Sequence, residues 1–119
     1  MDLVLTAVAG LMGAAGVGLA AAAAHAAPDP RLGVMAQMLM VHAAAILALV
    51  GLGRAVPAAP FGWAGAAMAL GVCLFSADLA ARHWLGDRLF PFAAPLGGAL
   101  TILSWALATA IAIFAIARR

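Results

Sequence analysis

The amino-acid sequence predicts an all-α integral membrane protein, a four-transmembrane-helix bundle with short loops. Hydrophobic residues make up 68% of the 119 residues, whereas charged residues make up 8%. The mean hydropathy is +1.18. A soluble domain is about half apolar and about a quarter charged, and a small one has too little interior to hide so much apolar surface. We therefore expect residues 1–119 to form a single domain in the lipid bilayer.

Each expected helix is an apolar run bounded by proline or charge. About 20 apolar residues are enough to cross the hydrocarbon core as a helix. The first run ends at Pro28-Asp29-Pro30, and we interpret it as a retained helix because Asp2 stands where a signal peptide carries Lys or Arg. The expected helices cover residues 3–26, 32–52, 61–81 and 95–117.

The connection over residues 83–94 differs from the other loops because it is amphipathic. Apolar and aromatic residues alternate there with His83, Asp87 and Arg88. Segments of this kind lie in the headgroup layer rather than in water. We expect interfacial aromatic anchors at Trp63, Trp84, Phe90 and Phe92.

The arginines indicate loops that flank membrane spans. They stand one or two at a time between apolar runs, which is not the pattern of a basic patch that binds nucleic acid. An even number of spans places both termini on one side, and the positive-inside count is then tied. Three arginines lie on the side of the termini and three on the other: Arg54, Arg118 and Arg119 against Arg31, Arg82 and Arg88. We favour cytoplasmic termini.

Small residues in the first and last runs predict close helix packing. Pairs of small residues four positions apart let two backbones approach closely in lipid. The expected packing glycines are Gly10, Gly13, Gly16, Gly18, Gly97 and Gly98. On this basis the first helix should be the most buried element, unless an alanine-rich composition simply supplies small residues everywhere.

Four polar residues within or beside the spans form the candidate polar cluster: His25, His42, Asp78 and Arg82. Ionisable groups inside a membrane are costly and are candidates for function. The spacing of Asp78 and Arg82 favours a helical ion pair. The alternative joins His25 to Asp78 as a proton-responsive or ligand-binding cluster. For His42 we expect a neutral imidazole bonded to a neighbouring helix.

No catalytic residues, cofactor or metal ligands are expected. A haem held by His25 and His42 would need both at one depth, but their places in the runs differ by about 12–15 Å of helical rise. The single Cys73 allows no disulfide framework and is expected to be buried and inert.

Several short motifs follow one another along the chain. A Gly-rich first run ends in Ala24-His25, and it is followed by His42-Ala43-Ala44-Ala45-Ile46-Leu47, Leu74-Phe75-Ser76, Pro95-Leu96-Gly97-Gly98 and Trp105. With them the chain resembles the bacterial domain-of-unknown-function 423 family of small four-helix membrane proteins. It is similar also to an animal mitochondrial transmembrane protein of the same size. The resemblance implies four helices with both termini in the cytoplasm, and no established activity.

The chain departs from the family pattern at three places. An alanine run over residues 20–24 replaces Gly and an aromatic residue, and Ala77-Asp78 replaces Gly-Ser. A Gln that usually comes close before the second His is displaced to Gln37. We therefore interpret the chain as a divergent member in which any polar site at these positions is altered.

Together these observations favour a non-catalytic protein of the bacterial inner membrane. We expect it to act by packing, either as an accessory subunit of a larger membrane complex or as a homo-oligomer. The alternative is a small transporter or channel with a polar path that involves His42 and Asp78. A membrane enzyme is the least favoured class.

Overall fold

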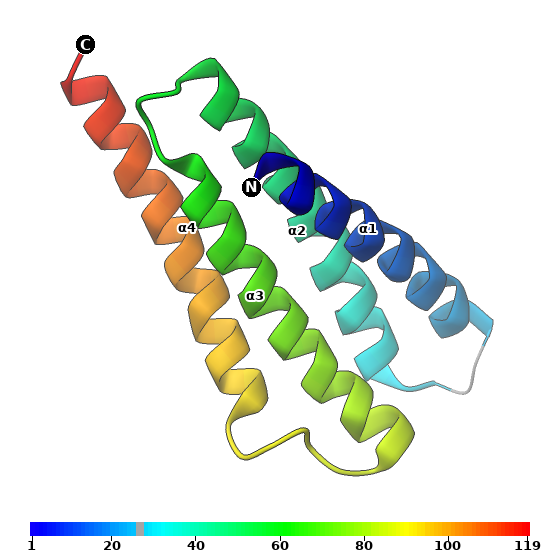
Figure 1. The fold of residues 1–119 in the computed structure, drawn as a ribbon. Coiled ribbons are helices and arrows are strands. Elements are labelled where there is room, and N and C mark those ends of the chain that lie inside the picture. The colour runs from blue at the N-terminus through cyan, green and yellow to red at the C-terminus, as the bar shows by residue number, and fades with distance from the viewer. Residues whose placement is uncertain (26–27) are drawn as a thin grey trace.

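The computed structural model describes residues 1–25 and 28–119 and contains four long helices that run back and forth between the two ends of the molecule (Figure 1). They are α1 (Asp2–His25), α2 (Pro30–Ala55), α3 (Phe61–Ala80) and α4 (Ala93–Ala117), and a π-helical turn, η1 (Ala81–Leu85), continues α3. All four spans are long and apolar enough to cross a membrane. The predicted fold class is therefore confirmed: the chain is an all-α, multi-pass membrane protein.

Local sequence explains where the helices begin. The side chain of Asp29 accepts a hydrogen bond from the backbone of Arg31, so it caps α2, and Pro30 occupies the first position of that helix. As a result α2 begins two residues earlier than predicted. In α4 the first residue is Ala93, so Pro95 lies inside the first turn, where a backbone N–H has no acceptor within the helix. The predicted end of the first helix, residue 26, lies outside the described residues.

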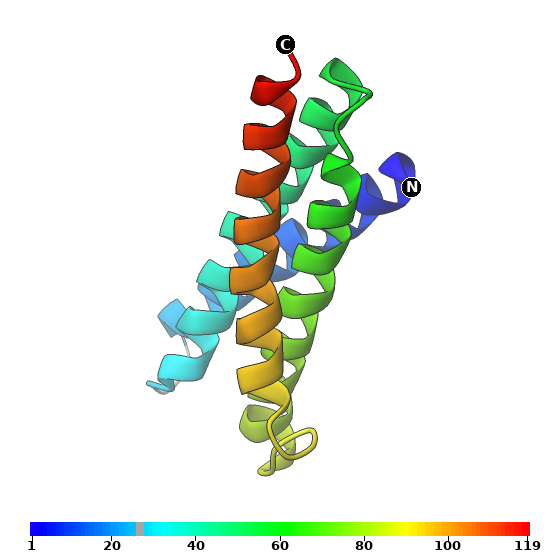
Figure 2. The ribbon, with the colours of Figure 1, turned by 90° about the vertical axis from the view of Figure 1, so that its left-hand side faces the viewer.

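The helices pack in chain order, each against the next. The main contacts join α1 to α2, α2 to α3, and α3 to α4, so α2 and α3 are the central pair. Figure 2 shows α4 in front and α1 behind, on opposite sides of this pair. Nearly all of the largest fully buried side chains come from the central pair: Leu32, Met35, Ile46, Met68, Val72 and Asp78.

The expectation that the first helix is the most buried element is wrong. In the apolar part of α1 22% of the residues are buried, against 50% in the span that contains α3. The reason is that α1 packs along α2 and only slightly against α3, which leaves its opposite face uncovered. Cys73, expected to be buried, is also exposed on the surface of α3.

The two ends of the molecule differ in their polar residues. The terminal end holds Asp2, the loop over residues 56–60 and the pair Arg118-Arg119. The polar end holds residues 28–31 and 78–92. Both termini lie at the terminal end, as an even number of spans requires (Figure 1).

Candidate functional site

Asp78 is a fully buried charged side chain of the polar end. Its carboxylate oxygen Oδ2 lies 2.7 Å from Nε of Arg82, and the Asp78 side chain is fully buried. This confirms the ion pair that the spacing predicted. The second oxygen, Oδ1, accepts a hydrogen bond of 2.8 Å from the backbone N–H of Leu89. One carboxylate therefore holds both η1 and the segment that leads to α4.

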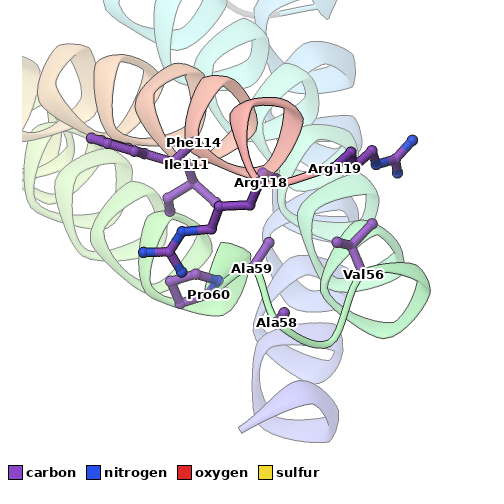
Figure 3. Close-up of a pocket in the computed structure, with 9 residues that line it drawn as sticks. Val56, Ala58, Ala59, Pro60, Ile111, Phe114, Arg118 and Arg119 are labelled. Carbon is purple, nitrogen blue, oxygen red and sulfur yellow. The ribbon is translucent and has the colours of Figure 1, made fainter.

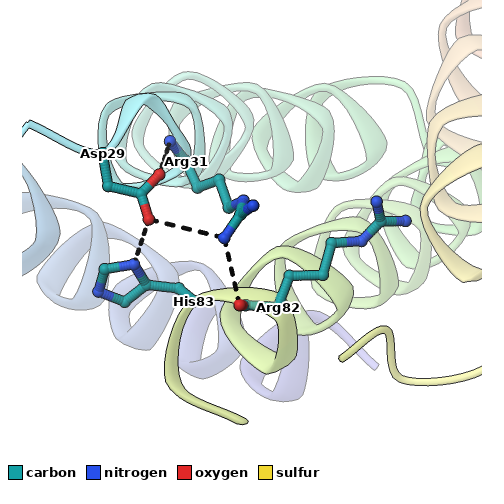
Figure 4. Close-up of polar contacts among 4 residues, drawn as sticks. All are labelled: Asp29, Arg31, Arg82 and His83. Atoms are coloured by element: carbon teal, nitrogen blue, oxygen red, sulfur yellow. Dashed lines mark hydrogen bonds and ion pairs between the residues drawn. The ribbon is translucent and has the colours of Figure 1, made fainter. Parts of the chain in front are cut away.

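A second cluster, drawn in Figure 4, ties the start of α2 to η1. The ring nitrogen Nδ1 of His83 lies 2.5 Å from Oδ2 of Asp29. The guanidinium of Arg31 donates to the backbone carbonyl of Arg82 at 3.2 Å and lies 3.7 Å from Oδ2 of Asp29. These contacts join segments that are more than 50 residues apart in the chain.

The surroundings of Asp29 favour its charged form. The backbone N–H of Arg31, followed by the side chain of His83, lowers the pKa of Asp29 below its ordinary value of 3.8. Both groups bond to the ionised carboxylate, which stabilises it. Asp29 is therefore charged at neutral pH and acts as the acceptor of this cluster.

Sequence reasoning missed Asp29, Arg31 and His83 as members of the cluster. Two signals were available, because Asp29 precedes a proline as a helix cap does, and His83 follows directly on Arg82. What the sequence did not show is that Asp29 and Arg31, at the start of α2, lie against η1.

The structure does not bring His25 to Asp78. His25 is exposed at the end of α1. Among the described residues, both oxygens of Asp78 are taken by Arg82 and Leu89. The proton-responsive pairing considered above is therefore not formed.

His42 links α2 to α4. Its Nδ1 lies 2.7 Å from the carbonyl oxygen of Met38, and its Nε2 lies 3.3 Å from the indole nitrogen of Trp105. A carbonyl only accepts and an indole N–H only donates, so both contacts suit an imidazole that carries its proton on Nδ1. The expected bond of His42 to a neighbouring helix is confirmed, and its neutral state stays a prediction.

The six predicted packing glycines fall into three groups of two. A Cβ at Gly16 would lie 2.5 Å from Cγ of Met40, and one at Gly97 would lie 2.5 Å from the backbone nitrogen of Phe75. At Gly13 and Gly98 the nearest atoms are at ordinary contact distance, 3.8 and 3.9 Å. At Gly10 and Gly18 a Cβ would meet nothing within 4 Å. Close approach therefore concerns Gly16 and Gly97.

Sequence reasoning did not single out Gly71, which faces Gly97 across the α3–α4 contact. A Cβ at Gly71 would lie 2.7 Å from the backbone nitrogen of Thr101 and 2.9 Å from the carbonyl oxygen of Gly97. Two glycines on facing helices thus bring the backbones of α3 and α4 together.

The aromatic residues chosen as interfacial anchors lie at both ends and are exposed. Trp63 stands in the first turn of α3 at the terminal end, and Trp84, Phe90 and Phe92 surround the polar end. Aromatic side chains at both levels are typical of the interfaces of a membrane protein.

The terminal end has a cavity of about 500 Å³ between the loop over residues 56–60 and the last turns of α4 (Figure 3). Its walls are mainly apolar, with two arginines at the rim: Val56, Ala58, Ala59, Pro60, Ile111, Phe114, Ala115, Arg118 and Arg119. Within residues 1–25 and 28–119, no three His, Cys or Asp side chains lie close enough together to hold a metal ion.

Comparison with known proteins identifies the family of the chain. The family model described as "Protein of unknown function (DUF423)" matches residues 19–98, about two thirds of the chain. The matched part runs from the last turns of α1 to the first turns of α4. No curated protein and no solved structure matches the chain.

Proposed function

The chain belongs to the DUF423 family of proteins of unknown function, and we propose that it is a non-catalytic assembly protein. It packs through α1 against a transmembrane helix of another chain, in a larger membrane complex or a homo-oligomer. It resides in the bacterial inner membrane with both termini in the cytoplasm, as its resemblance to the family implies.

The outward face of α1 carries the proposal. Gly10, Ala14 and Gly18 follow one another at intervals of four residues, and all three are exposed. A Cβ at either glycine would meet nothing of this chain within 4 Å. In lipid, such a row of small residues lets a second helix approach closely enough for dispersion and backbone contacts to hold it.

The face of α4 on the other side of the molecule has a different character. Its exposed side chains are bulky and apolar, among them Ile102, Leu103, Ile113 and Phe114. Flexible lipid tails cover such a surface well. On α1 the row of small residues runs between the exposed side chains of Leu11 and Val17, and this regular row favours α1 as the protein-binding side.

A groove beside this face adds support. It has a volume of about 470 Å³ and is lined by Ala15 and Gly18 of α1, by α2, and by Ser76 of α3. The hydroxyl of Ser76 is the one buried side-chain polar atom without a hydrogen-bond partner in the described part of the chain. Unpaired polar groups in an apolar medium are costly. A helix packed on α1 would cover the groove and shield this part of the chain from lipid.

The alternative of a transporter or channel gains no support from His42 and Asp78. His42 uses both ring nitrogens within the chain. Asp78 uses both carboxylate oxygens. Groups that are saturated in this way stabilise helix contacts and offer no free site to a passing ion.

The test is gentle extraction from the native membrane followed by intact-complex mass spectrometry of wild type, Ala14→Leu and Ala106→Leu. Ala14 and Ala106 are both exposed helical alanines, on α1 and α4. We expect wild type and Ala106→Leu to carry a stoichiometric partner or second copy, and Ala14→Leu to lose it. A monomeric wild type, or equal loss in both variants, would contradict the proposal.

A further inference from the structure

The side-chain charges are distributed unequally between the two ends. The polar end holds three arginines and three aspartates, so its side-chain charges cancel: Arg31, Arg82 and Arg88 with Asp29, Asp78 and Asp87. At the terminal end Asp2 is the only acidic side chain, and it pairs with Arg54 at 3.2 Å. The whole formal charge of +2 therefore comes from Arg118 and Arg119.

The cavity of the terminal end exists because α4 packs on α3 and hardly on α2. The last turns of α4 consequently stand apart from the loop over residues 56–60, and the cavity lies between them. In Figure 3 the side chain of Arg118 extends toward Pro60, while Arg119 lies on the side of Val56.

Both arginines at the cavity lack an ionic partner in the chain. Within the described residues, no carboxylate lies within 4.0 Å of either guanidinium. The walls beside them are apolar, chiefly Ile111 and Phe114. Free positive charge at the rim and apolar surface next to it match a molecule with an anionic head and a hydrocarbon tail.

We propose that this cavity binds an anionic phospholipid. The phosphate pairs with Arg118, and Arg119 adds to the attraction. The glycerol and the first part of an acyl chain lie against Ile111 and Phe114. Basic pockets at the ends of membrane helices are suited to acidic headgroups, and guanidinium groups bind phosphate through paired N–H donors. This site lies on α4, so it is independent of the proposed contact through α1.

The test uses delipidated protein in detergent, titrated with phosphatidylglycerol or with phosphatidylcholine of the same acyl chains, and lipid adducts are counted by native mass spectrometry. We expect one tightly bound phosphatidylglycerol molecule per protein and much weaker binding of phosphatidylcholine. Each arginine near an anionic headgroup contributes about fivefold in affinity. Arg118→Gln should therefore lower the affinity for phosphatidylglycerol about fivefold, and the double variant Arg118→Gln/Arg119→Gln should lower it about 25-fold.

Three controls separate this site from general attraction to charge. Arg88→Gln removes an exposed arginine of the polar end and should leave the affinity unchanged. Ala58→Leu keeps both charges but fills the cavity from an exposed loop position, and it should weaken binding. Glycerol 1-phosphate, which has the headgroup chemistry without acyl chains, should not compete. The proposal would be overturned if both lipids bound equally, or if Arg88→Gln weakened binding as much as Arg118→Gln. It would also be overturned if Ala58→Leu left binding unchanged, or if glycerol 1-phosphate competed fully.

Discussion

At the level of single residues, Asp78 connects two segments through one carboxylate. It bonds to Arg82 of η1 and to the backbone of Leu89. Asp78→Ala would leave a cation and a backbone N–H without their partner. Since the Arg82 side chain is 35% exposed, the loss of stability should be smaller than the about 3–5 kcal/mol of a fully buried ion pair. Asp78→Asn can still accept the hydrogen bond from the backbone N–H of Leu89 and should lose less stability. Denaturant unfolding in detergent measures the stability of both variants, and wild-type stability in Asp78→Ala would contradict this role.

Asp29 gives the polar end a dependence on pH. Its pKa in the folded protein lies below its ordinary value of 3.8. A lowered pKa contributes stability above the unfolded value, and that contribution is lost as the pH falls through the folded value. Thermal stability of the wild type should therefore decrease on acidification below about pH 4.

The matched variant for this prediction is Asp29→Asn, since Asn also caps helices and removes only the charge. Its melting temperature should change less than that of the wild type over the same acidic range. Asp87→Asn, whose carboxylate bonds only to the neighbouring backbone N–H of Arg88, should behave like the wild type. If Asp29→Asn and wild type respond equally to acid, the ionised Asp29 is not what fastens the start of α2 to η1.

Sequence reasoning succeeded for polar contacts that are local and missed those that depend on tertiary structure. Asp78 and Arg82 are four residues apart on one helix, so their pairing follows from helical geometry. Asp29 and His83 are separated by 54 residues. Their contact exists only because α2 lies against α3, which no pattern in the sequence indicates.

At the level of helices, the contact of α3 with α4 depends on glycine at two facing positions. Gly97→Ala would place a Cβ 2.5 Å from the backbone of Phe75, so the helices must separate. Overpacking of this kind costs about 1–3 kcal/mol. The neighbouring change Gly98→Ala meets only a side-chain atom at 3.9 Å and should be tolerated. Unfolding of both variants under identical conditions tests the difference, and equal stabilities would argue against this close approach.

The glycine content of the first helix predicted its burial wrongly for a physical reason. Glycine shows where another backbone can approach, but it does not show whether that backbone belongs to the same chain. Gly16 faces Met40 of α2, whereas Gly10 and Gly18 face outward. The glycines of α1 therefore form one contact within the chain, and they also form the outward surface that we propose binds a partner.

At the level of the whole molecule, the four spans could be predicted because the bilayer restricts the backbone. In the hydrocarbon core no water is present to bond the backbone, so its N–H and C=O groups must form hydrogen bonds within the chain. Long apolar runs therefore become helices. The order in which these helices pack was not predictable, since each is apolar on all sides. The cavity and the outward face of α1 follow from that order, and both lay beyond sequence reasoning.

The most direct test of the proposed assembly role is photocrosslinking in intact cells. A diazirine-bearing amino acid replaces Ala14 in one strain and Ala106 in another, and irradiated products are identified by mass spectrometry. We predict a single discrete protein adduct, a foreign subunit or a second copy, from position 14, and lipid adducts from position 106. Lipid adducts alone at position 14, or the same protein adducts from both positions, would contradict the assignment of α1 as the surface that binds another helix.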